Sequence, residues 1–186
     1  MRKISISVIF AAICCAAASA AQADAGYSAP VFSEVSPQVL KALPRIPPVA
    51  KKGDQASLLA PAEPLRSMRV VAVESDRGGV ETFDTNGMPP YETQKQHAGG
   101  SKLLVSTFEI GHGRAYAKYN GANLGYVEKA LCQDYAGSWH LCTNGELVAG
   151  WLKTWNAAGR GAGQFESWST SLNMPYNTYQ ANIKVK

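Results

Sequence analysis

A short turn carries the side chains of this chain best suited to acid–base chemistry. The turn is Gly111-His112-Gly113-Arg114, and it follows an expected strand that carries Glu109 near its end. Histidine with a carboxylate partner, here Glu109 or Asp134, is a common acid–base pair. A histidine on a surface loop has the same local pattern, so both interpretations stand. His112, Arg114 and Glu109 are the candidate catalytic residues.

Two cysteines, Cys132 and Cys142, are separated by nine residues that include a turn signal. In an exported protein such a pair is expected to form a disulfide, which would stabilise the fold by roughly 2–3 kcal/mol. The alternative is a redox or metal site, because His140 lies two residues from Cys142. His97 and His112 are far away in the sequence, and no CxxC or HxxxH grouping occurs. We therefore expect no metal and no other cofactor.

The C-terminal part of the chain is rich in large aromatic side chains. We single out Trp151, Trp155, Trp168 and Tyr176 as a candidate binding surface for sugar rings or for a partner. Trp151 and Trp155 would share one face if residues 146–155 form a strand. The other interpretation is that these rings build the core of a small β domain.

Motifs for other chemistries are incomplete. Asp84-Thr85-Asn86-Gly87 begins like a calcium loop, but its sixth and twelfth positions are Pro89 and Lys95, so we expect a turn. The glycine-rich segment 159–163 lacks the Gly-Lys-Ser/Thr ending of a phosphate-binding loop and is expected to be a hairpin loop. The sequence contains no Gly-x-Ser-x-Gly nucleophile elbow.

Residues 1–23 read as a secretory signal peptide. Arg2 and Lys3 precede a mostly apolar run, and Ala21-Gln22-Ala23 is a small-x-small cleavage site. A membrane anchor needs about 20 apolar residues, and polar residues interrupt this run. A lipoprotein would need a small residue where an isoleucine precedes Cys14. We expect a secreted or periplasmic product with no stable membrane insertion after cleavage.

The charge of the product is nearly balanced. The chain has 18 Lys and Arg and 14 Asp and Glu, and loss of Arg2 and Lys3 leaves 16 against 14. No run of basic residues is present, so nucleic acid is not an expected partner. A glycan, a cell-wall polymer or a protein surface fits this composition better.

Residues 24–64 contain most of the prolines. We expect a flexible, extended linker there, with a docking or processed segment as the alternative. Residues 37–43 could form two helical turns after Ser36 as the N-cap.

Residues 65–186 predict a mainly β fold, a single antiparallel β-sandwich or barrel-like domain. Residues 124–135 also fit a short helix, and Asn120-Gly121 favours a type I′ hairpin turn. In the last strand, Ala181, Ile183 and Val185 alternate with polar residues, which is typical of one buried face. The expected strands are 68–75, 102–110, 114–119, 126–131, 138–142, 146–155, 164–169 and 180–185.

Three segments, 108–121, 155–159 and 169–178, resemble stretches of the YolA-like family of small secreted bacterial proteins. The resemblance covers about residues 65–186. It implies secretion and a compact domain of unknown function, and it supplies no catalytic residues. The Cys132–Cys142 pair is not part of the family's general pattern.

Two hypotheses of function follow. The first is a secreted, non-enzymatic β-rich module that binds a glycan, a cell-wall polymer or a protein surface. The second is a small secreted hydrolase or toxin-like effector that uses His112 with Glu109 and Arg114. A purely structural envelope component is a third interpretation.

Overall fold

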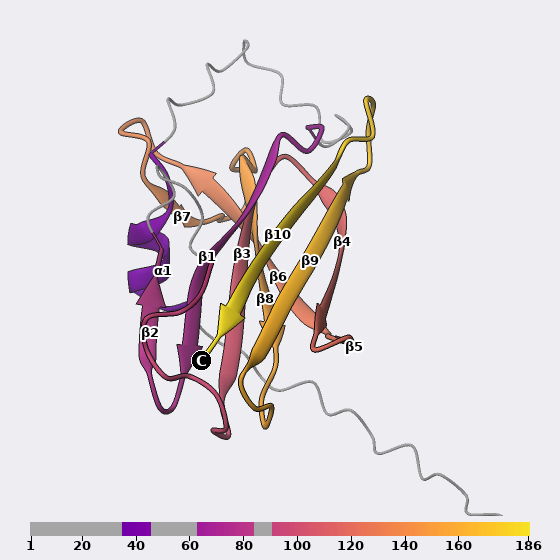
Figure 1. The fold of residues 1–186 in the computed structure, drawn as a ribbon. Helices are drawn as coiled ribbons and strands as arrows, with labels where there is room; N and C mark the ends of the chain where they lie inside the picture. The colour runs from indigo at the N-terminus through magenta and orange to yellow at the C-terminus, as the bar shows by residue number, and fades with distance from the viewer. Residues whose placement is uncertain (1–34, 46–62, 84–90) are drawn as a thin grey trace, which may run out of the picture. The chain divides into compact units, whose positions relative to one another are not determined.

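Two antiparallel β-sheets and one short helix make up the part of the chain that the structure describes. The computed structural model describes residues 35–45, 63–83 and 91–186. The strands of both sheets run antiparallel to their neighbours. The predicted mainly β, antiparallel fold is therefore confirmed (Figure 1).

The larger sheet has six strands in the order β2-β1-β3-β8-β6-β7. Strand β3 lies near its centre and is buried along almost its whole length, because both faces of the sheet are covered at that point. The strands are β1 (Ser67–Ser75), β2 (Gly79–Thr82), β3 (Leu103–Ile110), β6 (Tyr126–Gln133), β7 (Trp139–Leu141) and β8 (Gly150–Asn156).

The smaller sheet has four strands in the order β10-β9-β4-β5. Its strands alternate between buried and exposed residues, so one face packs inward and the other meets solvent. Figure 1 shows β9 and β10 in front of strands of the larger sheet. The strands are β4 (Gly113–Tyr119), β5 (Ala122–Asn123), β9 (Gly163–Ser171) and β10 (Thr178–Val185).

The main hydrophobic core lies between the two sheets. Trp155, the largest side chain in it, has no exposed surface. Small residues of β4, Ala115 and Ala117, belong to the same cluster, and they leave volume for the indole. The other buried members are Val70, Val73, Phe83, Leu103, Val105, Tyr119, Ala157, Phe165, Ile183 and Val185.

A second core covers the opposite face of the six-stranded sheet. Helix α1 (Pro37–Ala42) contributes Val39, and Leu43 follows it; both pack in one cluster with Phe108 of β3. The indole N–H of Trp139 donates to the backbone carbonyl of Pro44 at 2.7 Å. Ser36 occupies the N-cap position but makes no side-chain capping bond. Residues 35–45 of the predicted flexible segment thus pack on the sheet.

Local patterns explain several elements. Ile183 and Val185 are fully buried while Asn182 and Lys184 are exposed, as the alternation in the last strand predicts. Asn120 and Gly121 both have positive φ, 49° and 81°, which is the geometry of a type I′ turn, and they join β4 to β5.

The strand expected at 126–131 is confirmed as β6, because its backbone groups pair with β8, and the helical alternative is wrong. The structure differs from the sequence-based expectations at other strands. Strand β8 begins at Gly150, because Glu146 turns back onto Thr143 and ends any strand there. Strands β2 and β5 were not expected, since both are short and lie beside turns.

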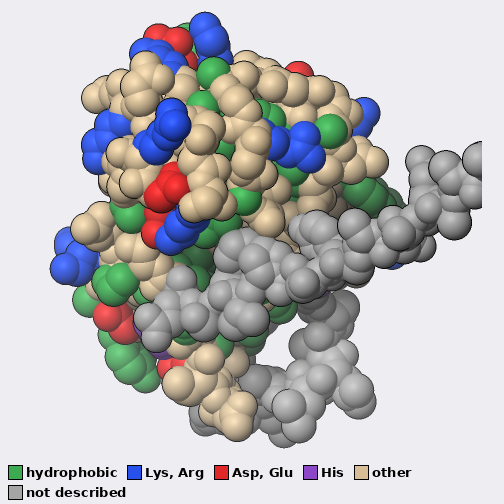
Figure 2. Space-filling view, turned by 90° about the horizontal axis from the view of Figure 1, so that it is seen from below, with side chains coloured by type: hydrophobic (Ala, Val, Ile, Leu, Met, Phe, Trp, Pro, Cys, Tyr) green, Lys and Arg blue, Asp and Glu red, His purple; other side chains and the backbone are tan. Residues whose placement is uncertain are grey.

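Some predictions fall outside the described residues. The predicted signal peptide, 1–23, and the predicted turn at 84–87 are among them. Within the described part of the chain, no helix has the length and apolar character needed to cross a membrane. On the face drawn in Figure 2, Lys and Arg side chains are scattered among hydrophobic and neutral ones.

The packing of α1 predicts a measurable contribution to stability. Leu43→Ala should lower the free energy of unfolding by about 2 kcal/mol or more, because it removes a buried side chain from the second core. Urea denaturation followed by tryptophan fluorescence measures this change. Lys41→Ala, an exposed substitution on the same helix, is the control and should change stability by less than about 0.5 kcal/mol. Equal stability of both variants would contradict the docking of α1.

Candidate functional site

The predicted residue His112 lies where β4 and β6 run near each other without pairing. Strand β4 pairs with β9, and β6 pairs with β8. His112, just before β4, places its Nε2 3.4 Å from Glu128 Oε1 on β6, and both side chains are about one quarter exposed, 25% each. We call this place the β4–β6 junction and define it by His112, Arg114 and Tyr116 on one side and Tyr126 and Glu128 on the other.

A buried lysine connects the junction to the protein interior. Lys153 of β8 donates to Glu109 Oε2 at 2.7 Å and to the carbonyl of Gly113 at 2.7 Å, and its Nζ lies 3.3 Å from Glu128 Oε2. Lys153 and Glu109 have no exposed surface. The strand register pairs Glu128 with Lys153, and alternation places Glu109 on the same face. One chain of polar contacts therefore runs from Glu109 to His112.

Burial and the neighbouring ammonium of Lys153 have opposite effects on the charge state of Glu109, at the inner end of these polar contacts. Desolvation raises the pKa of the Glu109 carboxyl, and the ammonium of Lys153 opposes that rise. Glu109 Oε1 and the hydroxyl oxygen of Ser169 are both buried, and neither makes a hydrogen bond of normal geometry. The Ser169 hydroxyl still lies close enough to lower the pKa of Glu109. A Cβ at Gly113 would lie 2.3 Å from Ser169 Oγ, so glycine leaves room for that hydroxyl. Lys153 is thus the main group that stabilises a charged Glu109.

Aromatic rings enclose the polar chain. The His112 imidazole stacks on the indole of Trp151, with centroids 4.4 Å apart and planes inclined by 24°. The Tyr126 ring lies 4.5 Å from that of Trp155, and Lys153 Nζ lies 5.8 Å from the Tyr126 centroid. Burial, and then the charge of Glu128, raise the pKa of Tyr126, so this phenol keeps its proton at neutral pH.

The structure brings together only part of the predicted catalytic set. His112 contacts Glu128, and Lys153 separates it from Glu109. Arg114 is exposed on β4 and acts electrostatically on Tyr126. The other proposed partner, Asp134, accepts a hydrogen bond from the backbone of Ser138 in a turn. Glu128 was missed because residues 124–135 fitted either a helix or a strand.

The four predicted binding aromatics occupy different places. The assignment of Trp155 to a binding surface is wrong, because this residue is fully buried and no sugar ring can stack on it. Its indole N–H donates to the hydroxyl of Thr107 at 3.0 Å. Trp151 is half-buried under His112. Trp168 is partly exposed on β9, and Tyr176 is exposed in the turn between β9 and β10. Their roles in binding stay predictions.

The solvent-facing side of the four-stranded sheet adds aromatic residues that sequence analysis missed. Tyr116 is 61% exposed and lies directly opposite Trp168, which lies opposite Gln180. Period-two alternation in β4 is the signal that places Tyr116 there. We call this surface the outer face; it consists of Arg114, Tyr116, Lys118, Glu166, Trp168, Thr170, Thr178, Gln180, Asn182 and Lys184.

A buried Ser–His–Glu arrangement also escaped sequence analysis. Ser75 Oγ lies 2.9 Å from His97 Nδ1, and His97 Nε2 lies 3.1 Å from Glu81 Oε2. A catalytic triad uses the two ring nitrogens the other way round. Ser75 Oγ also accepts the Gly78 N–H, and the backbone N–H of His97 donates to the carbonyl of Lys186. These contacts tie the β1–β2 hairpin to the C-terminal end.

Backbone donors hold the acid of this arrangement in its charged form. Burial disfavours the carboxylate of Glu81, but the N–H groups of Gln94 and Lys95, with His97, outweigh it. The pKa of Glu81 therefore lies below its ordinary value. Because all three side chains are buried, this arrangement has a structural role.

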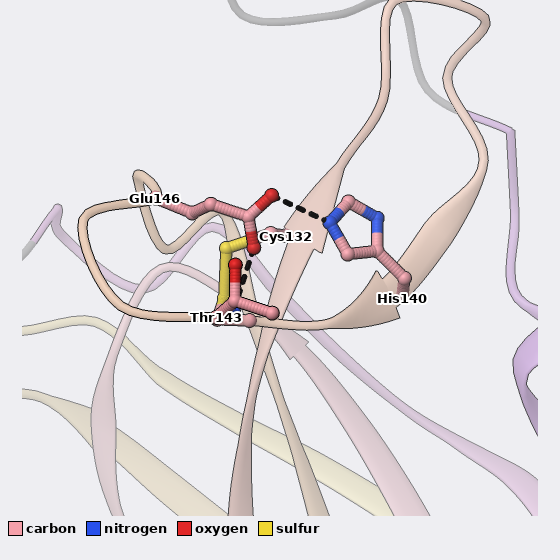
Figure 3. The surroundings of a disulfide bond; sticks show 5 residues. Cys132, His140, Thr143 and Glu146 are labelled. Atoms are coloured by element: carbon pink, nitrogen blue, oxygen red, sulfur yellow. Dashed lines mark hydrogen bonds and ion pairs between the residues drawn. A yellow bond between two sulfur atoms is a disulfide. The ribbon is translucent and has the colours of Figure 1, made fainter.

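The predicted disulfide between Cys132 and Cys142 is confirmed. The loop that follows it is fixed by Glu146, which accepts the N–H of Thr143 at 2.6 Å and contacts His140 Nε2 at 3.0 Å (Figure 3). These hydrogen bonds, the Thr143 backbone first, lower the pKa of Glu146 to about 2. Among the described residues, no group of three or more His, Cys, Asp or Glu side chains could hold a metal ion.

Comparison with known proteins gives a family and no function. The family model of a domain of unknown function, DUF4879, matches residues 60–185. No curated protein and no solved structure matches the chain.

The buried lysine yields a prediction about stability. Lys153→Met should lower the free energy of unfolding at neutral pH by about 3–5 kcal/mol, because it leaves the Glu109 carboxylate buried without a cation. The double variant Lys153→Met/Glu109→Gln should recover much of this loss. Chemical denaturation measures both, and Lys129→Met on the neighbouring strand, which should change stability by less than about 0.5 kcal/mol, is the control.

The pH dependence of the single variant provides a second measurement. A carboxyl whose pKa is raised on folding favours the folded state below its unfolded pKa, here about 4.5, and this contribution is lost as pH rises. The deficit of Lys153→Met should therefore shrink as the pH falls toward that value. A deficit independent of pH would contradict the role given to Glu109.

Proposed function

This chain belongs to the DUF4879 family, whose function is unknown, and we propose that it is an exported, non-enzymatic domain that binds a glycan through the outer face. The observation that carries the proposal is the cross-strand pair of Tyr116 and Trp168 on a solvent-facing sheet. We also propose that the chain is a YolA-like protein within this family.

The side chains of the outer face suit a sugar ring. One face of a pyranose presents C–H bonds, which pack on the electron-rich face of an aromatic ring. Its hydroxyl groups need hydrogen-bond partners, and Gln180 and Asn182 on β10 supply exposed amides beside the rings. The combination of rings and amides favours a hydroxylated ligand over a purely apolar one.

The outer face is also supported by a rigid scaffold. Strand β9 pairs with β4 on one side and with β10 on the other along most of its length. Tyrosine and tryptophan lose little conformational freedom when they bind, because each has two side-chain torsions. A preformed surface of this kind reduces the entropic cost of binding.

Export is part of the proposal and rests on two features. Residues 1–23 have the pattern of a secretory signal peptide. The Cys132–Cys142 disulfide is suited to an oxidising compartment outside the cytosol.

Substitution of the aromatic pair tests the glycan proposal. Tyr116→Ala and Trp168→Ala should each weaken binding at least tenfold on an array of soluble polysaccharides and purified cell-wall glycans, because each removes a stacking surface. Tyr135→Ala, an exposed tyrosine in the turn between β6 and β7, is the matched control and should bind like the wild type. Binding that survives both substitutions, or no binding to any glycan, would overturn the proposal.

A second candidate function is a secreted hydrolase centred on His112. Glu128 can hold the Nε2 proton of the imidazole, which leaves Nδ1 available as a base, and Trp151 fixes the ring plane. Here Glu128 takes the role first assigned to Glu109.

His112→Ala should abolish any hydrolytic activity found when the purified protein is screened against polysaccharides, esters and peptides. His140→Ala is the matched control, because His140 also contacts a carboxylate, Glu146, and lies on strand β7, outside the junction. An inactive wild type, or equal loss in both variants, would count against this candidate.

A further inference from the structure

We propose that the glycan bound by the outer face is an acidic polysaccharide built from uronic acids, and that Arg114 pairs with its carboxylates. This inference rests on the proposed glycan-binding function and names its ligand class. It is carried by the position of an unpaired cation beside an exposed aromatic pair.

The charges of the outer face are unequal. Its cations are Arg114, Lys118 and Lys184, and Glu166 is its one carboxylate. Lys118 lies directly opposite Glu166 across β4 and β9. Lys184 pairs with an acid outside the outer face: its Nζ lies 3.7 Å from Glu92 Oε2. Arg114 is therefore the cation of this face that has neither a carboxylate directly opposite it on the next strand nor an ion pair with a neighbouring acid.

The surroundings of Arg114 are neutral and polar. Its cross-strand partner is Thr170, which lies opposite Thr178, and the two hydroxyls are 2.9 Å apart. Within the described residues, the side chain of Arg114 makes no ion pair and no hydrogen bond, so its guanidinium is available to a ligand. Guanidinium donors match the two oxygens of a carboxylate in a bidentate pair.

The distance between Arg114 and the aromatic pair fits one sugar ring. Arg114 and Tyr116 are next neighbours on the same face of β4, so their Cα atoms are roughly 7 Å apart. A hexuronate carries its carboxylate on the rim of the ring. A ring stacked on Tyr116 or Trp168 can therefore place that carboxylate within reach of Arg114.

The carboxylates at and beneath the β4–β6 junction are paired with cations other than Arg114. Glu128 is the one carboxylate of β6, and it already contacts Lys153 and His112. Glu109 is fully buried beneath Lys153. Both acids are thus compensated by other cations, and Arg114 keeps its charge for an external anion.

An acidic polysaccharide fits better than a nucleic acid. A phosphate backbone is tracked by several cations in a row, whereas the outer face offers one unpaired arginine and carries Glu166. A uronate chain needs fewer cations, because its rings supply stacking and hydroxyl contacts as well.

The experiment compares probes that share the same sugar rings and differ in the charge of the carboxyl group. Binding of the full chain to polygalacturonate and alginate is measured against the methyl esters of the same polymers, which keep the sugar rings and lose the carboxylate charge. We expect the acidic forms to bind at least tenfold more tightly, with the preference falling as salt is added. Arg114→Gln should abolish the preference and leave the weaker binding of the esters. Arg77→Gln, in the β1–β2 turn, is the control and should retain the preference.

Each outcome decides between the two proposals. Equal binding of acid and ester, or binding of neutral glycans alone, would overturn the acidic ligand and leave glycan binding intact. A preference that persists in Arg114→Gln would overturn the role of that residue. Loss of both forms in Tyr116→Ala supports the glycan proposal, whereas binding of a single-stranded oligonucleotide in place of every polysaccharide would overturn both.

Discussion

The rest of this structure depends on the contacts that the buried ammonium of Lys153 makes. Its three partners are Glu109 of β3, Glu128 of β6 and the backbone carbonyl of Gly113 at the start of β4. One side chain thus joins three strands of the larger sheet to the smaller one. A charge removed from water is tolerated only when its partners are in place, so this contact penalises any other register of these strands.

The two faces of the larger sheet are covered by different elements. Between the sheets, aromatic and aliphatic residues surround Trp155, and the polar chain is confined to the edge near β4 and β6. On the other face, α1 and Trp139 cover Phe108 and its neighbours. The central strand β3 has buried residues on both faces for this reason, and its polar residues Ser106, Thr107 and Glu109 are buried together with its apolar ones.

Local patterns could be predicted from the sequence, and long-range pairings could not. Alternation in β10, the Asn120-Gly121 turn and the disulfide depend on residues close in the chain, and each was predicted. The contact of His112 with Glu128 depends on which strands become neighbours, and that follows from the whole topology. The aromatic residues show the same limit, because composition does not say which ring faces inward: Trp155 is buried and Tyr116 is exposed.

Two histidine–carboxylate pairs show how accessibility separates structure from function. His97 and Glu81 have good hydrogen-bond geometry, but both are buried and Ser75 completes an internal network. His112 and Glu128 are farther apart, yet both reach the surface. Interior polar groups in this domain are therefore committed to fixing strands against one another. The ligand recognition that we propose uses the outer face, which combines exposed aromatic rings with an arginine side chain that makes no ion pair within the described residues.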